Sequence, residues 1–130
     1  MNLTTNRGSI LVVDDDPACL KCAAQVLEDA GFATVFASNG EEALSRLAPR
    51  RVDVVVSDLV MPHMDGFELA ANIQARFSTV PVILTTSSKR DDLQKFALSC
   101  GAMALLRKPL DRDELMTAVT TALQRTRVPH

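Results

Sequence analysis

Short apolar segments that favour β-strands alternate five times along this chain with segments that favour helices. Strands that alternate with helices form a parallel sheet with right-handed crossovers, and the helices then cover both of its faces. The sequence therefore predicts an α/β fold with a doubly wound, five-stranded parallel sheet and five helices. The expected strands are Ser9 to Val13, Phe32 to Ala37, Val52 to Ser57, Val82 to Thr86 and Ala102 to Leu106.

Capping residues predict where the helices begin and end. Asp16 is a favoured N-cap, Pro17 suits the first helical position, and Gly31 ends the first helix. The other helices are expected to end near Ala48, to run from about Gly66 to Phe77, to begin near Asp91 and stop at Gly101, and to run from an N-cap at Asp111 to about Arg125. A frayed end is expected from Thr126 to His130.

Length and composition narrow the class of protein. The 130 residues suit a single domain spanning residues 1–130, with a core of about 9–125. Fourteen basic and sixteen acidic residues give a net charge of −2, which argues against a nucleic acid or a membrane surface as the main partner. No apolar run approaches the ~20 residues of a membrane span, and no signal-peptide pattern is present. The expected location is the cytoplasm.

Three cysteines, an odd number, fit a reducing compartment better than a disulfide framework. Cys19 and Cys22 form a C-x-x-C motif on the first expected helix. No second pair of Cys or His lies near enough in sequence to complete a zinc site. The residues between the thiols, Leu20 and Lys21, also differ from the Pro or Gly usual in thioredoxin-like motifs, so a redox or metal function is disfavoured.

Acidic side chains follow two of the expected strands. Asp14 and Asp15 follow the first strand, and Asp58 ends the apolar run of the third. The carboxyl ends of parallel strands meet at the edge where open α/β sheets bind ligands. Carboxylates this close raise one another's pKa values, and a hard divalent cation relieves the repulsion. One or two direct carboxylates with waters suit Mg²⁺, so we expect a magnesium site here.

The fourth and fifth expected strands lead to Thr86 and Lys108, at the same edge of the sheet. A hydroxyl and an ammonium beside carboxylates and a cation form a cradle for a phosphoryl group, because each donor or positive charge matches a phosphoryl oxygen. Lys108 precedes Pro109, and a cis peptide bond there would fix the direction of the lysine.

In this order and at these spacings, these residues resemble the receiver domain of two-component response regulators. The resemblance runs from about Ser9 to Arg125. It is carried by Leu11 to Asp16, by Asp58 to Gly66, by Thr86 and by Lys108-Pro109. It implies a flavodoxin-like fold with strand order 2-1-3-4-5.

The resemblance also implies a function in a phosphorelay. Asp58 would accept a phosphoryl group from a phosphohistidine on a histidine kinase or a histidine phosphotransfer protein. Mg²⁺ would be held by Asp15, Asp58 and the backbone carbonyl of Val60, with Asp14 acting through water. The domain would catalyse its own phosphorylation and slow dephosphorylation by positioning and electrostatics.

By the same resemblance, phosphorylation would be signalled through a change in the surface of the domain. Lys108 would pair with the phosphoryl group, and Thr86 would move to hydrogen-bond it. That movement would shift the face formed by the fourth helix, fifth strand and fifth helix. An unidentified downstream protein would bind there, and a phosphorylation-dependent homodimer is a further possibility.

Some positions differ from the family's usual pattern or vary within the family. Leu105 stands where the family often has an aromatic residue whose rotamer changes on phosphorylation. The output is therefore expected to be weaker, or to be carried by the loop after Thr86. Val60 and Ser88 occupy two variable positions that flank the phosphoryl site. An apolar Val60 offers nothing to orient an attacking water, so a long-lived phosphoryl group is expected.

Cys19 and Cys22 have two further interpretations. Phosphodonors of the family dock on the first helix, and the two cysteines could form part of that apolar docking surface together with Val26. Simple partial burial in the core is the alternative.

Three other functions are weaker matches. A haloacid-dehalogenase-like phosphatase shares the Asp-x-Asp of Asp14 and Asp16, but Pro17 indicates a helix start and no later acidic pair follows Lys108. A flavodoxin-like flavin carrier would need a phosphate-binding loop where this chain has three acids, and the chain has no Trp or Tyr to stack on a flavin. A degenerate receiver that only binds partners would not need the complete set of phosphorylation residues.

Overall fold

The fold is built on one parallel sheet of five strands in the order β2-β1-β3-β4-β5. The computed structural model describes residues 7–49 and 51–127. The strands are Ser9–Val13 (β1), Ala33–Ala37 (β2), Val54–Asp58 (β3), Val82–Thr86 (β4) and Ala104–Arg107 (β5). The predicted fold class and strand order are confirmed.

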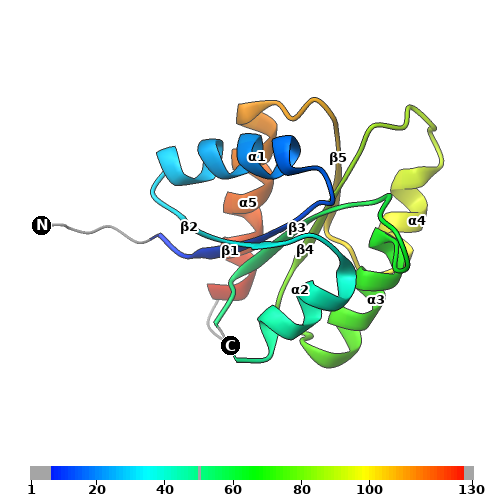
Figure 1. Cartoon of the computed structure of the whole chain (residues 1–130), viewed down its shortest axis with the longest axis horizontal. Coiled ribbons are helices and arrows are strands. Elements are labelled where there is room, and N and C mark those ends of the chain that lie inside the picture. The colour runs from blue at the N-terminus through cyan, green and yellow to red at the C-terminus, as the bar shows by residue number, and fades with distance from the viewer. Residues whose placement is uncertain (1–6, 50, 128–130) are drawn as a thin grey trace, which may run out of the picture.

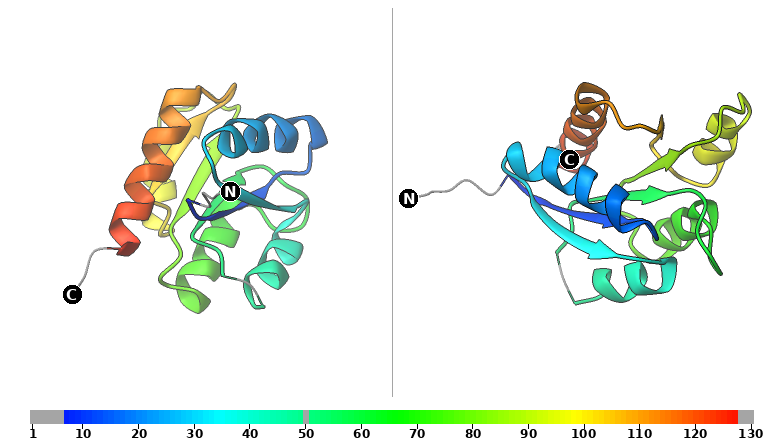
Figure 2. Two further views of the ribbon diagram at one scale, coloured as in Figure 1. Left: turned by 90° about the vertical axis from the view of Figure 1, so that its left-hand side faces the viewer. Right: turned by 45° about the horizontal axis from the view of Figure 1, so that its top comes forward.

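Helices cover both faces of the sheet (Figures 1 and 2). One face carries α1 (Pro17–Asp29) and α5 (Arg112–Arg127), and the other carries α2 (Gly40–Leu47), α3 (Gly66–Arg76) and α4 (Leu93–Ser99). Within the part of the chain that the structure describes, none of these helices combines the length and the apolar character that crossing a membrane requires.

The alternation of side chains along each strand supplies two cores. On β1, Leu11 and Val13 pack toward α2, α3 and α4, whereas Ile10 and Val12 pack toward α1 and α5. The central strand β3 is buried along its whole length, as its run of apolar residues predicts for a sheet covered on both faces. The carboxyl ends of β1, β3 and β4 therefore deliver polar side chains to a rigid edge.

Three predicted strands begin later in the structure than expected. The third strand was expected at residues 52–57 and lies at Val54–Asp58, so Asp58 belongs to the strand. The fifth was expected at residues 102–106 and lies at Ala104–Arg107. Ala102 instead completes the end of α4, because its N–H donates to the carbonyl of Ala97 at 2.9 Å. The second strand begins one residue late for a similar reason, since the N–H of Phe32 bonds to the carbonyl of Leu27.

The helix ends also differ in detail. Asp16 caps α1 as predicted, accepting from the N–H of Ala18 at 2.9 Å. α4 begins at Leu93, two residues later than expected. α5 continues to Arg127, so residues 126 and 127 are helical rather than frayed. The rest of that predicted frayed end, residues 128–130, lies outside the described residues.

Candidate functional site

Three aspartates meet at the carboxyl ends of β1 and β3, as predicted. Asp14 and Asp15 follow β1, Asp58 ends β3, and one carboxylate oxygen from each lies within 4.8 Å of the other two. Asp14 and Asp58 are buried, whereas Asp15 is exposed to solvent. Three oxygen donors open to water on one side suit a hard divalent cation that keeps several waters, which is the preference of Mg²⁺.

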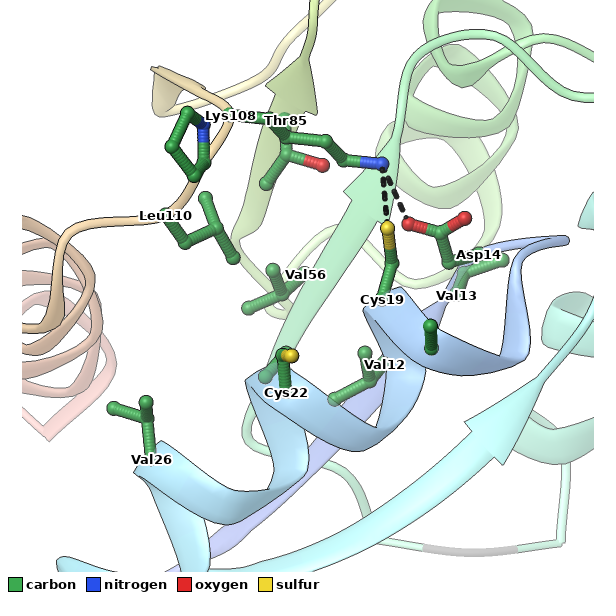
Figure 3. A pocket seen from close by; sticks show the side chains of 13 residues that line it. Val12, Val13, Asp14, Cys19, Cys22, Val26, Val56, Thr85, Lys108 and Leu110 are labelled. Carbon is green, nitrogen blue, oxygen red and sulfur yellow. Dashed lines mark hydrogen bonds and ion pairs between the residues drawn. The ribbon is translucent and has the colours of Figure 1, made fainter.

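Lys108 joins two of these carboxylates from the end of β5. Its Nζ lies 2.8 Å from Oδ2 of Asp14 and 3.3 Å from Oδ1 of Asp58. Figure 3 shows the side chain reaching across to Asp14. The Lys108–Pro109 peptide bond is cis, and the N–H of Lys108 donates to the carbonyl of Thr86 at 2.7 Å. We call Asp14, Asp15, Asp58 and Lys108 together the carboxylate site.

The charges in the carboxylate site are unbalanced. Burial raises the pKa of Asp58, and the neighbouring charge of Asp14 raises it further, while Lys108 offsets only part of this. Burial by itself would lower the pKa of Lys108, but the hydrogen bond to Asp14 and the charge of Asp58 raise it to about 12. The lysine therefore stays charged at neutral pH, and Asp58 is left with an unfavourable negative charge that an added cation would stabilise.

Thr86 ends β4 at the same edge and is buried. Its Oγ1 accepts a hydrogen bond from the N–H of Ser88 at 3.0 Å. A hydroxyl that accepts in this way keeps its own proton for donation. Thr86 lines a cavity of about 370 Å³ together with Val60, Ser88 and Arg90, between the loops that follow β3 and β4. The Thr86 hydroxyl therefore lies at the predicted edge of the sheet, hydrogen-bonded to the loop that follows β4.

The loop from β3 to α3 packs closely on the strand end that carries Asp58. The N–H of Gly66 donates to the carbonyl of Leu59 at 2.7 Å. A Cβ at Gly66 would lie 2.7 Å from the Asp58 carbonyl oxygen, closer than real Cβ atoms come, so glycine is required there. Val60, whose carbonyl was expected to bind the metal, is in this loop and is 72% exposed.

The contact of Cys19 with Lys108 and the position of Thr85 were not predicted from the sequence, in which Cys19 was expected to form part of a docking surface or to be partly buried. Cys19 Sγ lies 3.7 Å from Lys108 Nζ (Figure 3). Thr85 is buried on the face opposite to Thr86, and it lines an apolar cavity of about 270 Å³ with Cys19, Cys22 and Val26. The alternation of side chains along β4 was the available signal for Thr85. Burial raises the pKa of the Cys19 thiol, which keeps it neutral and makes thiolate chemistry unfavourable.

Comparisons with known proteins agree with one another. The family model "Response regulator receiver domain" matches residues 10–120. The chain is 38% identical over 117 residues to the transcriptional regulatory protein GlrR of Escherichia coli K12, covering 90% of this chain and 26% of that protein. It is 40% identical over 118 residues to an uncharacterized 14.6 kDa protein of Leptolyngbya boryana, covering 89% of this chain and 90% of that one.

A solved structure gives the same result. The signal receiver domain of a signal transduction histidine kinase from Syntrophus aciditrophicus has a TM-score of 0.85 and 32% sequence identity, with 95% of each chain covered. The present chain thus spans about a quarter of the E. coli regulator and nearly all of a separate receiver domain.

Proposed function

This chain belongs to the response regulator receiver domains, and we propose that it is a phosphoryl-accepting switch of a two-component phosphorelay. Asp58 is the proposed acceptor. The observation that carries the proposal is the pairing of a buried Asp58 with Lys108 at 3.3 Å, beside Asp14 and Asp15 at the open edge of the sheet. The match to this family favours it over the phosphatase and flavin-carrier alternatives.

The chemistry proposed for Asp58 is a direct phosphoryl transfer. A carboxylate oxygen of Asp58 forms a bond to phosphorus while the P–N bond of a donor phosphohistidine breaks, and the imidazole nitrogen keeps the electron pair. Lys108 already lies within reach of both Asp58 and Asp14, so its ammonium can pair with a phosphoryl oxygen without a large movement. Positioning and charge complementarity supply the catalysis.

A divalent cation is part of this proposal. Asp15 and Asp58 would bind Mg²⁺ directly together with the backbone carbonyl of Val60, and Asp14 would act through water. When bound, Mg²⁺ supplies positive charge that offsets the carboxylates and the transferred phosphoryl oxygens. The raised pKa of Asp58 supports this part of the proposal, because burial and the neighbouring charge of Asp14 both disfavour the ionised carboxylate.

Thr86 and Val60 are proposed to act after transfer. The proton of the Thr86 hydroxyl remains available for a phosphoryl oxygen, and movement of Thr86 would carry the following loop with it. Val60 is exposed and apolar, so it cannot orient an attacking water, and slow hydrolysis is expected. Replacement by glutamine should speed loss of the phosphoryl group. An unchanged hydrolysis rate would contradict this role.

We propose that the phosphodonor docks beside α1. The apolar cavity lined by Cys19, Cys22 and Val26 opens next to Lys108 (Figure 3), which places an apolar contact surface beside the acceptor. Replacing both cysteines by serine should slow transfer from a protein donor and spare transfer from acetyl phosphate. Equal slowing with both donors would reject the docking role.

The proposed output passes through one face of the molecule. The chain is proposed to form a single receiver domain over residues 1–130, in the cytoplasm, that does not itself bind nucleic acid. Signalling would pass through the face formed by α4, β5 and α5 to an unidentified protein or to a second copy of the chain. GlrR is named as a transcriptional regulator and is about four times as long as the matched segment, so transcriptional output is only one possibility for a protein carrying this domain.

The deciding experiment measures the intact mass of the protein after incubation with Mg²⁺ and acetyl phosphate. The parent should gain one phosphoryl group, and Asp58→Asn should gain none. Omitting Mg²⁺, or adding a chelator, should prevent the gain in the parent. A parent that gains nothing from acetyl phosphate or from a panel of phosphorylated donors would indicate a degenerate receiver that acts as a binding module.

A further inference from the structure

Arg107, the last residue of β5, bonds to a loop far away in the sequence. Its guanidinium donates to the backbone carbonyl of Ser88 and, at 2.8 Å, to that of Arg90. Both carbonyls belong to residues 87–92, which join β4 to α4 and which we call the β4–α4 loop. Arg107 therefore ties this loop to the strand that leads directly to Lys108.

The β4–α4 loop has its own series of contacts, and they begin at Thr86. The N–H of Ser88 donates to Thr86 Oγ1, and the N–H of Arg90 donates to Ser88 Oγ at 3.2 Å. The Arg90 side chain then pairs with Asp92, just before α4. Arg107 holds the carbonyls of the same two residues whose amides make these bonds. A movement of the Thr86 hydroxyl is therefore mechanically linked to the contacts of Arg107.

An arginine is suited to this position. Its planar guanidinium carries five donors in a fixed fork, so it can reach two carbonyls at once, whereas a lysine presents a single point of charge. Leu105, two residues earlier on β5, is apolar and packs against the core on the α3 and α4 side. Of these two β5 side chains, Arg107 is therefore the one that makes polar contacts with the loop.

We propose that Arg107 is a positioning residue that holds the β4–α4 loop in its resting arrangement and thereby opposes the movement of Thr86 toward a phosphoryl group on Asp58. This inference rests on the proposed function. Suppose that the Arg107 contacts exist in the resting loop and are lost on phosphorylation. They then stabilise the resting loop and lower the population of the arrangement that favours phosphorylation. Releasing the contact by mutation must therefore favour phosphorylation.

The test compares Arg107→Gln and Arg107→Lys with Arg112→Gln. Arg112 is an exposed arginine at the start of α5, and Arg112→Gln changes the net charge by the same amount as Arg107→Gln, whereas Arg107→Lys leaves it unchanged. Both Arg107 variants should accelerate amide hydrogen exchange at Ser88 and Arg90. With acetyl phosphate and saturating Mg²⁺, both should be phosphorylated about threefold to tenfold faster than Arg112→Gln, which is the scale of the net contribution of one hydrogen bond.

The kinetic parameter that changes distinguishes a positioning role of Arg107 from a simple loss of charge. Release of the loop should raise the maximum rate. Loss of an attractive charge would instead raise the acetyl phosphate concentration needed for half-maximal rate, and only in the glutamine variants. Rates equal to that of Arg112→Gln, or slower, would overturn the inference even if the parent is phosphorylated on Asp58. A parent that is not phosphorylated at all would instead reject the proposed function, while the exchange rates would still report whether Arg107 holds the loop.

Discussion

The carboxylate site and the β4–α4 loop lie at the same edge of the sheet, but they are held in place by different means. The carboxylate site joins a largely buried lysine to two buried aspartates at the ends of β1 and β3. The loop is held by exposed arginines, by a side-chain ion pair and by hydrogen bonds to backbone carbonyls. The charged groups of the site are costly to separate, whereas the exposed contacts of the loop contribute little each.

This difference suits the proposed switch. A group that accepts phosphate benefits from charges already fixed at the ends of buried strands, because fixed charges need no reorganisation during reaction. A segment that reports phosphorylation must instead change its arrangement for a small free energy. The short helix α4 of seven residues and its polar loop meet that requirement.

The largest effect on folding stability is expected from Lys108→Met. It leaves Asp14 and Asp58 without their cation, so the free energy of unfolding at pH 7 without Mg²⁺ should fall by about 2 to 3 kcal/mol. This expected loss is at or below the usual loss on breaking a buried ion pair, because 15% of the lysine side chain is exposed to solvent. Urea unfolding measures the loss.

The matched control is Lys95→Met, which replaces an exposed lysine on α4 and should change stability by less than about 0.5 kcal/mol. Similar losses of stability in both variants would show that the contacts of Lys108 are no more stabilising than those of an exposed lysine.

Asp58→Asn is expected to stabilise the fold in the absence of Mg²⁺, by on the order of 1 kcal/mol at pH 7. The pKa of Asp58 is raised in the folded protein, so folding favours its protonated form. The parent should therefore gain stability relative to the variant as pH falls from 7 through the raised pKa toward 4, and the difference should shrink. Added Mg²⁺ should also reduce the difference in stability between the two proteins, because it stabilises the parent.

The control for Asp58→Asn is Asp91→Asn, which removes an exposed carboxylate in the loop and should have little effect at either pH. Thermal or urea unfolding at pH 7 and pH 4.5 provides the comparison. A destabilised Asp58→Asn at pH 7 would mean that the ion pair with Lys108 outweighs burial and repulsion.

The smallest effect is expected from Arg90→Ala in the loop. Its pair with Asp92 is short, at 2.5 Å, but the two side chains are 65% and 49% exposed. Water and salt screen such a pair, so the change in unfolding free energy should stay below about 0.5 kcal/mol. A loss above about 1 kcal/mol in 0.15 M salt would show that the loop is held more firmly than an exposed ion pair allows.

Local patterns predicted most of the fold from the sequence. β1 and β4 have the expected bounds, because each is an apolar run with a clear polar or proline boundary. The third and fifth strands were placed about two residues early, since apolar Val52 and Ala102 read as strand residues in a linear pattern. In the folded chain Ala102 bonds back to α4 instead. Hydrogen bonds between neighbouring elements decide such boundaries, and a linear pattern does not contain them.

The carboxylate site was predictable because its members lie at the carboxyl ends of strands of one parallel sheet. Asp14, Asp58 and Lys108 each occupy a strand end, so knowing the sheet was enough to bring them together. The hydrogen bonds of Arg107 and the contact of Cys19 with Lys108 were not predictable in the same way. Their contacts depend on the path of the β4–α4 loop and on how α1 sits beside the end of β5, which are results of tertiary packing.

The burial of β3 has a consequence for how this molecule can come apart. β3 lies between β1 and β4 and is covered on both sides, whereas β5 is an edge strand of four residues, only partly covered. Local opening is expected to begin where burial is least, so β5 and α4 can loosen while the strand bearing Asp58 remains folded. If Asp58 carries a phosphoryl group as proposed, that group could stay in place while the α4–β5 surface is transiently unfolded, so the two states need not have the same lifetime.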